Sequence, residues 1–212
     1  MLPQYLDLLD KERQEVFKKL AAFSDEFILA GGTAIMLQLG HRHSYDFDCF
    51  SQKALSDYLI PKVNRIFDFQ AKPLINNSDF CLLKLKNNID LHFVFHPYKN
   101  LKKVIKTGYI PISDMDDLAA NKVNTIGRRG AWRDYVDLFF LLKWKKYTIN
   151  NLVTLGEKKF QSEFNSKLFL EQLVYFKDLE ITDTKFIKEK YSVSQIQNFL
   201  SDEVDNYLIQ VF

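Results

Sequence analysis

Two aspartates, Asp46 and Asp48, stand two residues apart in an aromatic-rich run that is typical of a β-strand. Because strand side chains alternate between faces, the two carboxylates project together while Phe47 and Cys49 point the other way. Two neighbouring anions repel each other and lose hydration when they are covered, so the pair requires a compensating cation. The spacing therefore predicts a cation site on one face of this strand.

A glycine turn, Gly31–Gly32, follows a short apolar segment upstream of the acid pair, and a predicted helix begins at Thr33. Glycine lets the backbone approach a ligand closely, and the free N–H groups of a helix N-terminus bind phosphate. A divalent metal that carries a nucleoside triphosphate would satisfy both the turn and the acid pair. We therefore expect a nucleotide site here.

A third acid, Asp90, interrupts a hydrophobic strand and lies on the face that it shares with His92, away from the apolar residues. Three carboxylates on one sheet face beside the glycine turn would form the oxygen-rich site that magnesium prefers. An exposed acid near a hairpin turn at Asn87–Asn88 is the alternative interpretation of Asp90.

The elements that must position these groups follow from the hydrophobic periodicity. Strands are predicted over 26–30, 45–50, 80–85 and 89–95, and helices over 5–23, 33–39 and 55–67. Beyond residue 112 only helical periodicity continues, over 114–129, 132–146, 150–160, 165–178 and 193–210. We expect an α/β (α+β) chain with an α/β core over residues 1–112 and a helical C-terminal lobe over residues 113–212.

The composition is that of a folded protein, since 47% of the 212 residues are hydrophobic and 15% are aromatic. A formal net charge of +2 gives no bulk attraction to nucleic acid, so any basic surface must be local. Cys49 and Cys81 stand in apolar segments, which favours free thiols in a reducing compartment. We find neither a signal peptide nor a membrane-length apolar stretch, and we expect a soluble, cytoplasmic protein without a membrane partner.

Three segments stand out as motifs: Gly31–Ile35, the long Gly-His-Arg-x-Ser-x-Asp-x-Asp-x-Phe pattern of Gly40–Phe50, and Arg133–Leu138. Together they resemble the AbiEii/AbiGii-type nucleotidyltransferase toxins of the DNA polymerase β-like superfamily. The resemblance extends over residues 26–142. It implies a mixed sheet with flanking helices, a helical lobe, and a bacterial toxin of abortive phage infection with a separately encoded antitoxin.

The resemblance also implies roles for the residues of the motifs. Asp46 and Asp48 would hold magnesium ions that bridge the triphosphate, while Asp90 would help to bind a second ion and to activate the attacking hydroxyl. The residues that it implies for nucleotide binding come from the glycine turn and the loop before the acid pair: Gly31, Gly32, Thr33, Arg42 and Ser44.

Lys122 lies in the first predicted C-terminal helix, where the family carries a lysine that contacts the triphosphate as a point charge. Asp134 and Asp137 are three residues apart on the next helix, and the resemblance implies that one of them orients Lys122 or an arginine. Composition alone favours a surface lysine, and the helix macrodipole alone would favour acids at a helix N-terminus.

Three arginines, Arg128, Arg129 and Arg133, cluster at the turn between these two helices. Arginine forks match phosphate oxygens, so Arg129 and Arg133 are candidates for contacting the nucleotide or an RNA backbone. Ordinary charge pairing at helix ends explains them equally well.

The predicted function is magnesium-dependent transfer of an NMP from an NTP to a hydroxyl, on an RNA such as tRNA. A small-molecule nucleotidyltransferase of the antibiotic-modifying kind would use the same acids on another acceptor. A non-catalytic module that binds RNA or a partner protein is the third alternative. Against it, a decayed site has no reason to keep three clustered acids.

Overall fold

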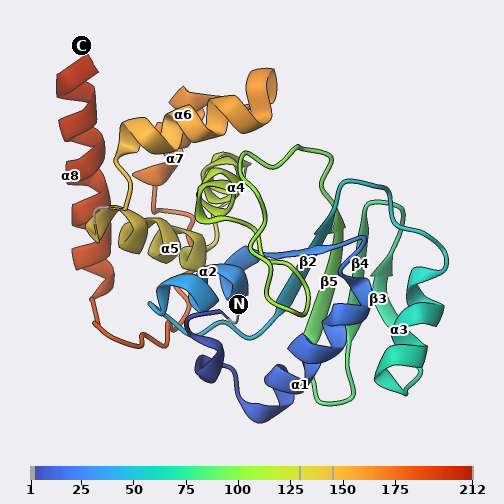
Figure 1. The fold of residues 1–212 in the computed structure, drawn as a ribbon. Helices are drawn as coiled ribbons and strands as arrows, with labels where there is room; N and C mark the ends of the chain where they lie inside the picture. The colour runs from blue at the N-terminus through green and yellow to red at the C-terminus, as the bar shows by residue number, and fades with distance from the viewer. Residues whose placement is uncertain (1–2, 129, 145, 212) are drawn as a thin grey trace. The chain divides into compact units, whose positions relative to one another are not determined.

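The computed structural model describes residues 3–128, 130–144 and 146–211 of the chain (Figure 1). Its residues group into two compact units, Met1–Asp114 and Met115–Phe212, which we name the sheet unit and the helical unit. The sheet unit holds all the described strands, and the helical unit consists, over its described residues, of helices and their connections. The α+β class predicted from the periodicity is confirmed.

The sheet unit contains a mixed five-stranded sheet with the strand order β1-β2-β5-β4-β3 (Figure 1). Its strands are β1 Ile28–Ala30, β2 Phe47–Ser51, β3 Pro73–Asn76, β4 Phe80–Lys84 and β5 Asp90–Phe95. β2 and β5 run parallel, whereas the other neighbouring pairs are antiparallel. This order places two strands that are distant in the chain, β2 and β5, in direct hydrogen-bonded contact.

One face of this sheet forms the hydrophobic core of the unit. Phe47, Cys49 and Phe93 point to this face and are fully buried. The rings of Phe23 and Phe27 pack against Phe93 at centroid distances of 5.4 and 4.9 Å. The helical elements of the unit are η1 Leu6–Leu8, α1 Lys11–Lys19, η2 Leu20–Phe23, α2 Gly31–Leu39 and α3 Leu59–Phe67. Because strand side chains alternate, the opposite face remains for polar groups.

In α5 (Trp132–Lys143) of the helical unit, only Arg133 and Lys143 are exposed. The elements of this unit are α4 Met115–Arg128, α5 Trp132–Lys143, α6 Ile149–Phe160, η3 Gln161–Glu163, α7 Ser166–Leu173 and α8 Val193–Val211. The start of α6 is defined by a reciprocal capping box between Thr148 and Asn151. A helix that is buried on nearly all sides requires covering neighbours, and α4 and α8 pack against α5.

The N-terminal region differs most from the periodicity-based prediction. A single helix over 5–23 is wrong, because Asp10 caps the N-terminus of α1 by accepting a hydrogen bond from the backbone N–H of Arg13, and 3₁₀ turns flank α1. The helix predicted over 55–67 begins only at Leu59. Pro61 therefore lies in its first turn, where a missing N–H breaks no helical hydrogen bond.

Other predicted bounds are also corrected by the structure. Strand β3 was not predicted, and all four of its residues are exposed, so it carries no hydrophobic alternation. The helix predicted over 165–178 ends at Leu173, and the one predicted over 132–146 ends at Lys143. Within the described parts of the chain, none of the helices has the length and apolar character that a membrane crossing requires.

Candidate active site

The acid pair lies at the start of β2. This strand begins at Phe47, so Asp46 immediately precedes it and Asp48 is its second residue, a correction to the predicted strand over 45–50. In the parallel register Asp48 is the partner of His92 on β5, and His92 Nδ1 lies 2.7 Å from Asp48 Oδ1. The alternation places Phe47 and Cys49 in the core while Asp48 stays partly exposed, at 26% of its side chain.

The glycine turn directly contacts Asp48. Gly31 is the first residue of α2 and adopts a left-handed φ of +65°. A Cβ atom at this position would lie 1.8 Å from Asp48 Oδ2, so the carboxylate occupies the space that a side chain would fill. Glycine is required here both by its backbone conformation and by the approach of Asp48. The turn and the acid pair therefore belong to one site.

The loop before the acid pair folds back onto the same turn. The Thr33 hydroxyl donates to the backbone carbonyl of Asp46 at 2.5 Å and lies 3.1 Å from the Ser44 hydroxyl. A Cβ atom on Gly32 would lie 2.8 Å from the Arg42 guanidinium and 2.9 Å from the Ser44 hydroxyl. The structure thus brings the predicted nucleotide-binding residues of the sheet unit into mutual contact.

The N-terminus of α2 has no side-chain cap. Its N-cap residue is Ala30, whose methyl group cannot accept a hydrogen bond from the first N–H groups of the helix. The predicted helix over 33–39 therefore starts two residues earlier, at Gly31, because the helix begins inside the glycine turn. The uncapped N–H groups open beside Asp48, which is the arrangement that favours an anion.

Asp90 lies next to this site with a partner of its own. It pairs across the β4–β5 register with Lys84, whose Nζ lies 2.5 Å from Asp90 Oδ1. The two side chains are 43% (Lys84) and 27% (Asp90) exposed, so the ion pair is open to solvent. In the structure Asp90 is thus a partly exposed acid that is paired with Lys84.

His92 is the residue of this site to which sequence reasoning assigned no role, although it shares the face of Asp90. Burial lowers the pKa of His92, but the hydrogen bond to Asp48 and the charges of Asp48, Asp46 and Asp90 raise it by more. The net pKa lies above the ordinary value of 6.5. All three predicted acids are therefore close enough to act on one imidazole.

Whether these residues suit magnesium depends on the number of protein donors. Among the described residues, no group of three or more His, Cys, Asp or Glu side chains is arranged to hold an ion. Magnesium commonly takes only one or two carboxylates and completes its shell with water and substrate phosphates. Asp46 and Asp48 beside an uncapped helix N-terminus fit that mode of binding.

The helical unit contains a second group of predicted residues. Lys122 Nζ lies 2.6 Å from Asp134 Oδ1 and 2.8 Å from Asp137 Oδ2. The Lys122 side chain is 11% exposed, that of Asp134 5% and that of Asp137 0%, so Lys122 is not a surface lysine. Both acids hold the lysine in place, and the triphosphate contact implied by the resemblance stays a prediction.

Two of the three predicted arginines lie among the described residues. Arg128 forms an exposed ion pair with Glu163, with Arg128 Nη2 3.5 Å from a carboxylate oxygen. Arg133 is exposed on α5. Arg129 lies outside the described residues.

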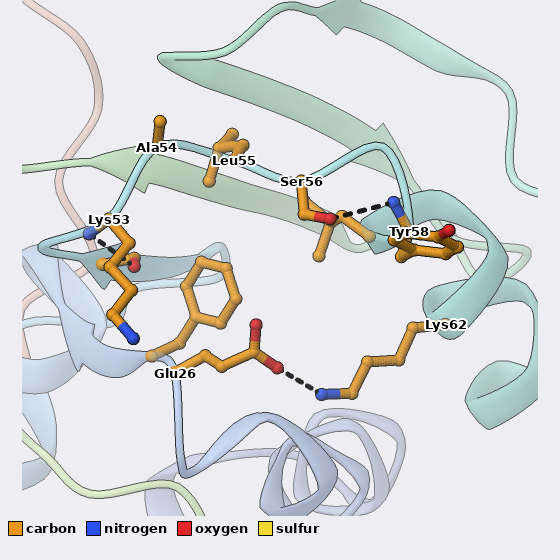
Figure 2. Close-up of a pocket in the computed structure, with 10 residues that line it drawn as sticks. Glu26, Lys53, Ala54, Leu55, Ser56, Tyr58 and Lys62 are labelled. Carbon is orange, nitrogen blue, oxygen red and sulfur yellow. Dashed lines mark hydrogen bonds and ion pairs between the residues drawn. The ribbon is translucent and has the colours of Figure 1, made fainter.

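A separate hollow of about 200 Å³ lies elsewhere in the sheet unit (Figure 2). Among the residues that line it, Lys62 Nζ lies 2.7 Å from Glu26 Oε1. Figure 2 marks this ion pair with a dashed line. Ser51, at the far end of β2 from Asp48, lines the hollow. None of its lining residues belongs to the glycine turn or the acid pair, so this hollow is distinct from the candidate active site.

Comparison with known families identifies the family of the chain. The family model described as "Nucleotidyl transferase AbiEii toxin, Type IV TA system" matches residues 17–208. The chain belongs to the AbiEii nucleotidyl transferase toxin family. The resemblance carried by the three sequence motifs is thereby confirmed. A toxin-type nucleotidyltransferase is the class of enzyme that this membership supports.

The chain also has relatives over nearly its whole length. It is 28% identical over 206 residues to the uncharacterized protein aq_aa25 of Aquifex aeolicus, covering 94% of this chain and 98% of the relative. A putative nucleotidyltransferase from H. pylori aligns at 16% identity with a TM-score of 0.59, covering 96% of this chain and 99% of the other. MenT4, a nucleotidyltransferase toxin from Mycobacterium tuberculosis, aligns at 13% identity with a TM-score of 0.57, covering 91% of this chain and 80% of the other. At these identities the solved structures demonstrate a common fold.

Proposed function

We propose that this chain is a magnesium-dependent enzyme that transfers an NMP from an NTP to a hydroxyl group on an RNA such as tRNA. The observation that carries the proposal is the contact between Gly31 and Asp48. It joins an uncapped helix N-terminus, which suits a phosphate, to a carboxylate pair, which suits a divalent cation.

Triphosphate binding is assigned to the N-terminus of α2 and the residues folded around it. The backbone N–H groups of the turn would donate to phosphate oxygens, because they have no side-chain cap. The hydroxyls of Thr33 and Ser44 lie beside them, and the buried Arg42 supplies a positive charge behind Gly32. These groups neutralise and orient the nucleotide before any bond changes.

Asp46 and Asp48 would hold the magnesium ion. Bound there together with the nucleotide, the ion supplies the positive charge that neutralises the phosphate oxygens during transfer. Asp90 is the proposed ligand of a second ion, and its ion pair with Lys84 must first break. Breaking the pair requires little free energy, because solvent-exposed ion pairs contribute about 1 kcal/mol or less to stability.

The reaction forms one phosphorus–oxygen bond and breaks another. The acceptor hydroxyl oxygen attacks the α-phosphorus of the NTP, the bond to the bridging oxygen breaks, and pyrophosphate leaves. Asp90, once it is free of Lys84, is placed on the same sheet face as Asp48 and would accept the hydroxyl proton. The enzyme mainly has to position its reactants and neutralise charge, which agrees with how few groups the site contains.

The choice of a separately encoded antitoxin as partner rests on the toxin family, whereas RNA as acceptor rests on the resemblance of the sequence motifs alone. The family description names a toxin–antitoxin system, and MenT4 is described as a nucleotidyltransferase toxin. The small-molecule acceptor and the non-catalytic module have no specific observation in their favour.

The test uses purified protein, magnesium, total RNA and each of the four NTPs labelled at the α-phosphate. We expect label from at least one NTP to enter RNA, and Asp48→Asn to reduce the rate at least about 100-fold, beyond the loss typical of a group that merely supports a metal ligand. Asp57→Asn, an exposed loop acid outside the site, is the matched control and should keep the wild-type rate.

Thermal unfolding of both variants checks that they fold. Failure of every NTP to label RNA or added small-molecule acceptors would favour the binding module. Label transfer that survives Asp48→Asn unchanged would remove Asp48 from the reaction.

A further inference from the structure

The two oxygens of Asp48 are constrained differently. Asp48 Oδ2 rests against the backbone of Gly31, in the space where a Cβ would lie 1.8 Å away. Asp48 Oδ1 lies 2.7 Å from Nδ1 of His92. An ionised carboxylate only accepts hydrogen bonds, so His92 Nδ1 must carry the proton and donate it to Oδ1. The carboxylate is thus fixed from the turn on one side and from β5 on the other.

His92 is itself held in place. It lies in the middle of β5, with Asp48 as its partner on β2 and Leu82 as its partner on β4. The ring of Phe80 packs against its imidazole at a centroid distance of 5.9 Å. Only 22% of the His92 side chain is exposed. Because these contacts restrict the movement of the His92 ring, its hydrogen bond also restricts the carboxylate of Asp48.

We propose that His92 is the positioning residue for Asp48: its Nδ1–H holds the carboxylate in the orientation in which it receives the divalent cation. This inference rests on the proposed function, because it assigns a role relative to that cation. Without the donor, only the contact with Gly31 would restrict the Asp48 carboxylate, and ordering it would reduce the free energy of cation binding. Partners that orient metal ligands typically contribute 10–100-fold to metal affinity.

Two substitutions distinguish the contribution of the His92 hydrogen bond from that of its ring packing. His92→Phe keeps an aromatic ring against Phe80 and removes the donor. His92→Asn removes the ring and keeps an N–H donor close to the position of Nδ1. A donor role predicts that the Phe variant loses function and the Asn variant retains it, whereas a purely structural role in packing predicts the reverse.

The experiment measures the dissociation constant of Mn²⁺, by titration followed with electron paramagnetic resonance, for the full chain in the presence of an NTP. We expect His92→Phe to weaken Mn²⁺ binding about 10–100-fold and His92→Asn to stay within about 3-fold of wild type. In the transfer assay the Phe variant should need more magnesium but approach the wild-type kcat at saturation. The control on the same chain segment is His96→Leu, because the His96 ring packs on Phe50 and Tyr98 and not on Asp48.

The outcomes distinguish this inference from the proposed function. Asp48→Asn is the reference for loss of the cation site. If the wild-type chain binds no Mn²⁺, the proposed metal site itself fails. If wild type binds, Asp48→Asn does not, and His92→Phe binds like wild type, only the role of His92 is overturned. Equal weakening in the Phe and Asn variants would also overturn it, since the donor would then make no difference.

Discussion

The charged side chains of the two units differ in burial. In the sheet unit, the pairs Asp48–His92 and Asp90–Lys84 keep between 22% and 43% of their side chains exposed. In the helical unit, Lys122 and its two aspartates are nearly covered, and the pair Asp117–Lys159 is 1% exposed on each side with 2.7 Å between its charged atoms. Similar residue types therefore stand in contrasting environments.

This contrast separates two uses of charge. A half-exposed carboxylate is already hydrated, so exchanging its partner for a ligand requires little free energy. A buried pair has lost its water, and removing one partner leaves an uncompensated charge in the interior. The sheet unit thus offers groups that can rebind, whereas the helical unit uses ion pairs to define how α4 packs against its neighbours. Asp117 on α4 and Lys159 on α6 connect two helices in this way.

The strongest test of this contrast is Lys159→Met. Burial lowers the pKa of Lys159, and the hydrogen bond and charge of Asp117 offset only part of that shift. Loss of the ammonium would remove the Lys159 charge beside the buried Asp117 carboxylate, so we expect the free energy of unfolding to fall by about 3–5 kcal/mol. Urea denaturation followed by circular dichroism measures it.

The double variant Asp117→Leu with Lys159→Met is the control for that loss. Replacing both charges with apolar groups should restore most of the stability, because neither charge of this pair remains. If the single variant is as stable as wild type, the pair is not as deeply desolvated as its exposure indicates.

A second test, expected to have a smaller effect on stability, compares two glycines with positive φ. Gly108, at +85°, has no atom within 4 Å of where a Cβ would be, so Gly108→Ala isolates backbone strain, at about 1–2 kcal/mol. Gly31→Ala adds the collision with Asp48 to the same strain. We expect it to be less stable than Gly108→Ala and, unlike it, to lose RNA labelling.

Thermal unfolding and the labelling assay, run side by side, measure both consequences. Equal stability and equal activity of the two alanine variants would show that Asp48 does not depend on the space beside Gly31.

The smallest effect is expected for Lys84→Met, the same substitution as in the buried pair but made in a half-exposed one. The loss of the ion pair with Asp90 should lower the free energy of unfolding by about 1 kcal/mol or less, and less still at high salt. Urea denaturation at two salt concentrations measures this. A loss as large as that of Lys159→Met would erase the distinction between the two units.

Much of the local structure could be predicted from the sequence. The Asn87–Asn88 turn is confirmed, with Asn88 at a left-handed φ of +59°. Asp48 does lie on the polar face of its strand, opposite Phe47 and Cys49. In contrast, β3 escaped prediction because its exposed residues leave no alternation to detect, and the first helix was overextended because Asp10 interrupts it with a cap. Periodicity reports burial, and it fails where burial does not vary.

The partners of the site residues could not be predicted. Sequence alternation placed His92 and Asp90 on one face, but it contains no information on which strand lies beside them. The order β2-β5-β4 decides that Asp48 meets His92 and that Asp90 meets Lys84. Likewise, the pairing of Asp117 with Lys159 depends on the packing of α4 against α6.

By itself, the sequence determined the family, the glycine turn, the acid pair and the face on which that pair stands, because these depend on residue types at short spacing. Only the tertiary structure decided which basic side chains Asp48, Asp90 and Asp117 contact and how exposed those pairs are. Those properties arise from strand order and helix packing, which bring together residues that are far apart in the chain.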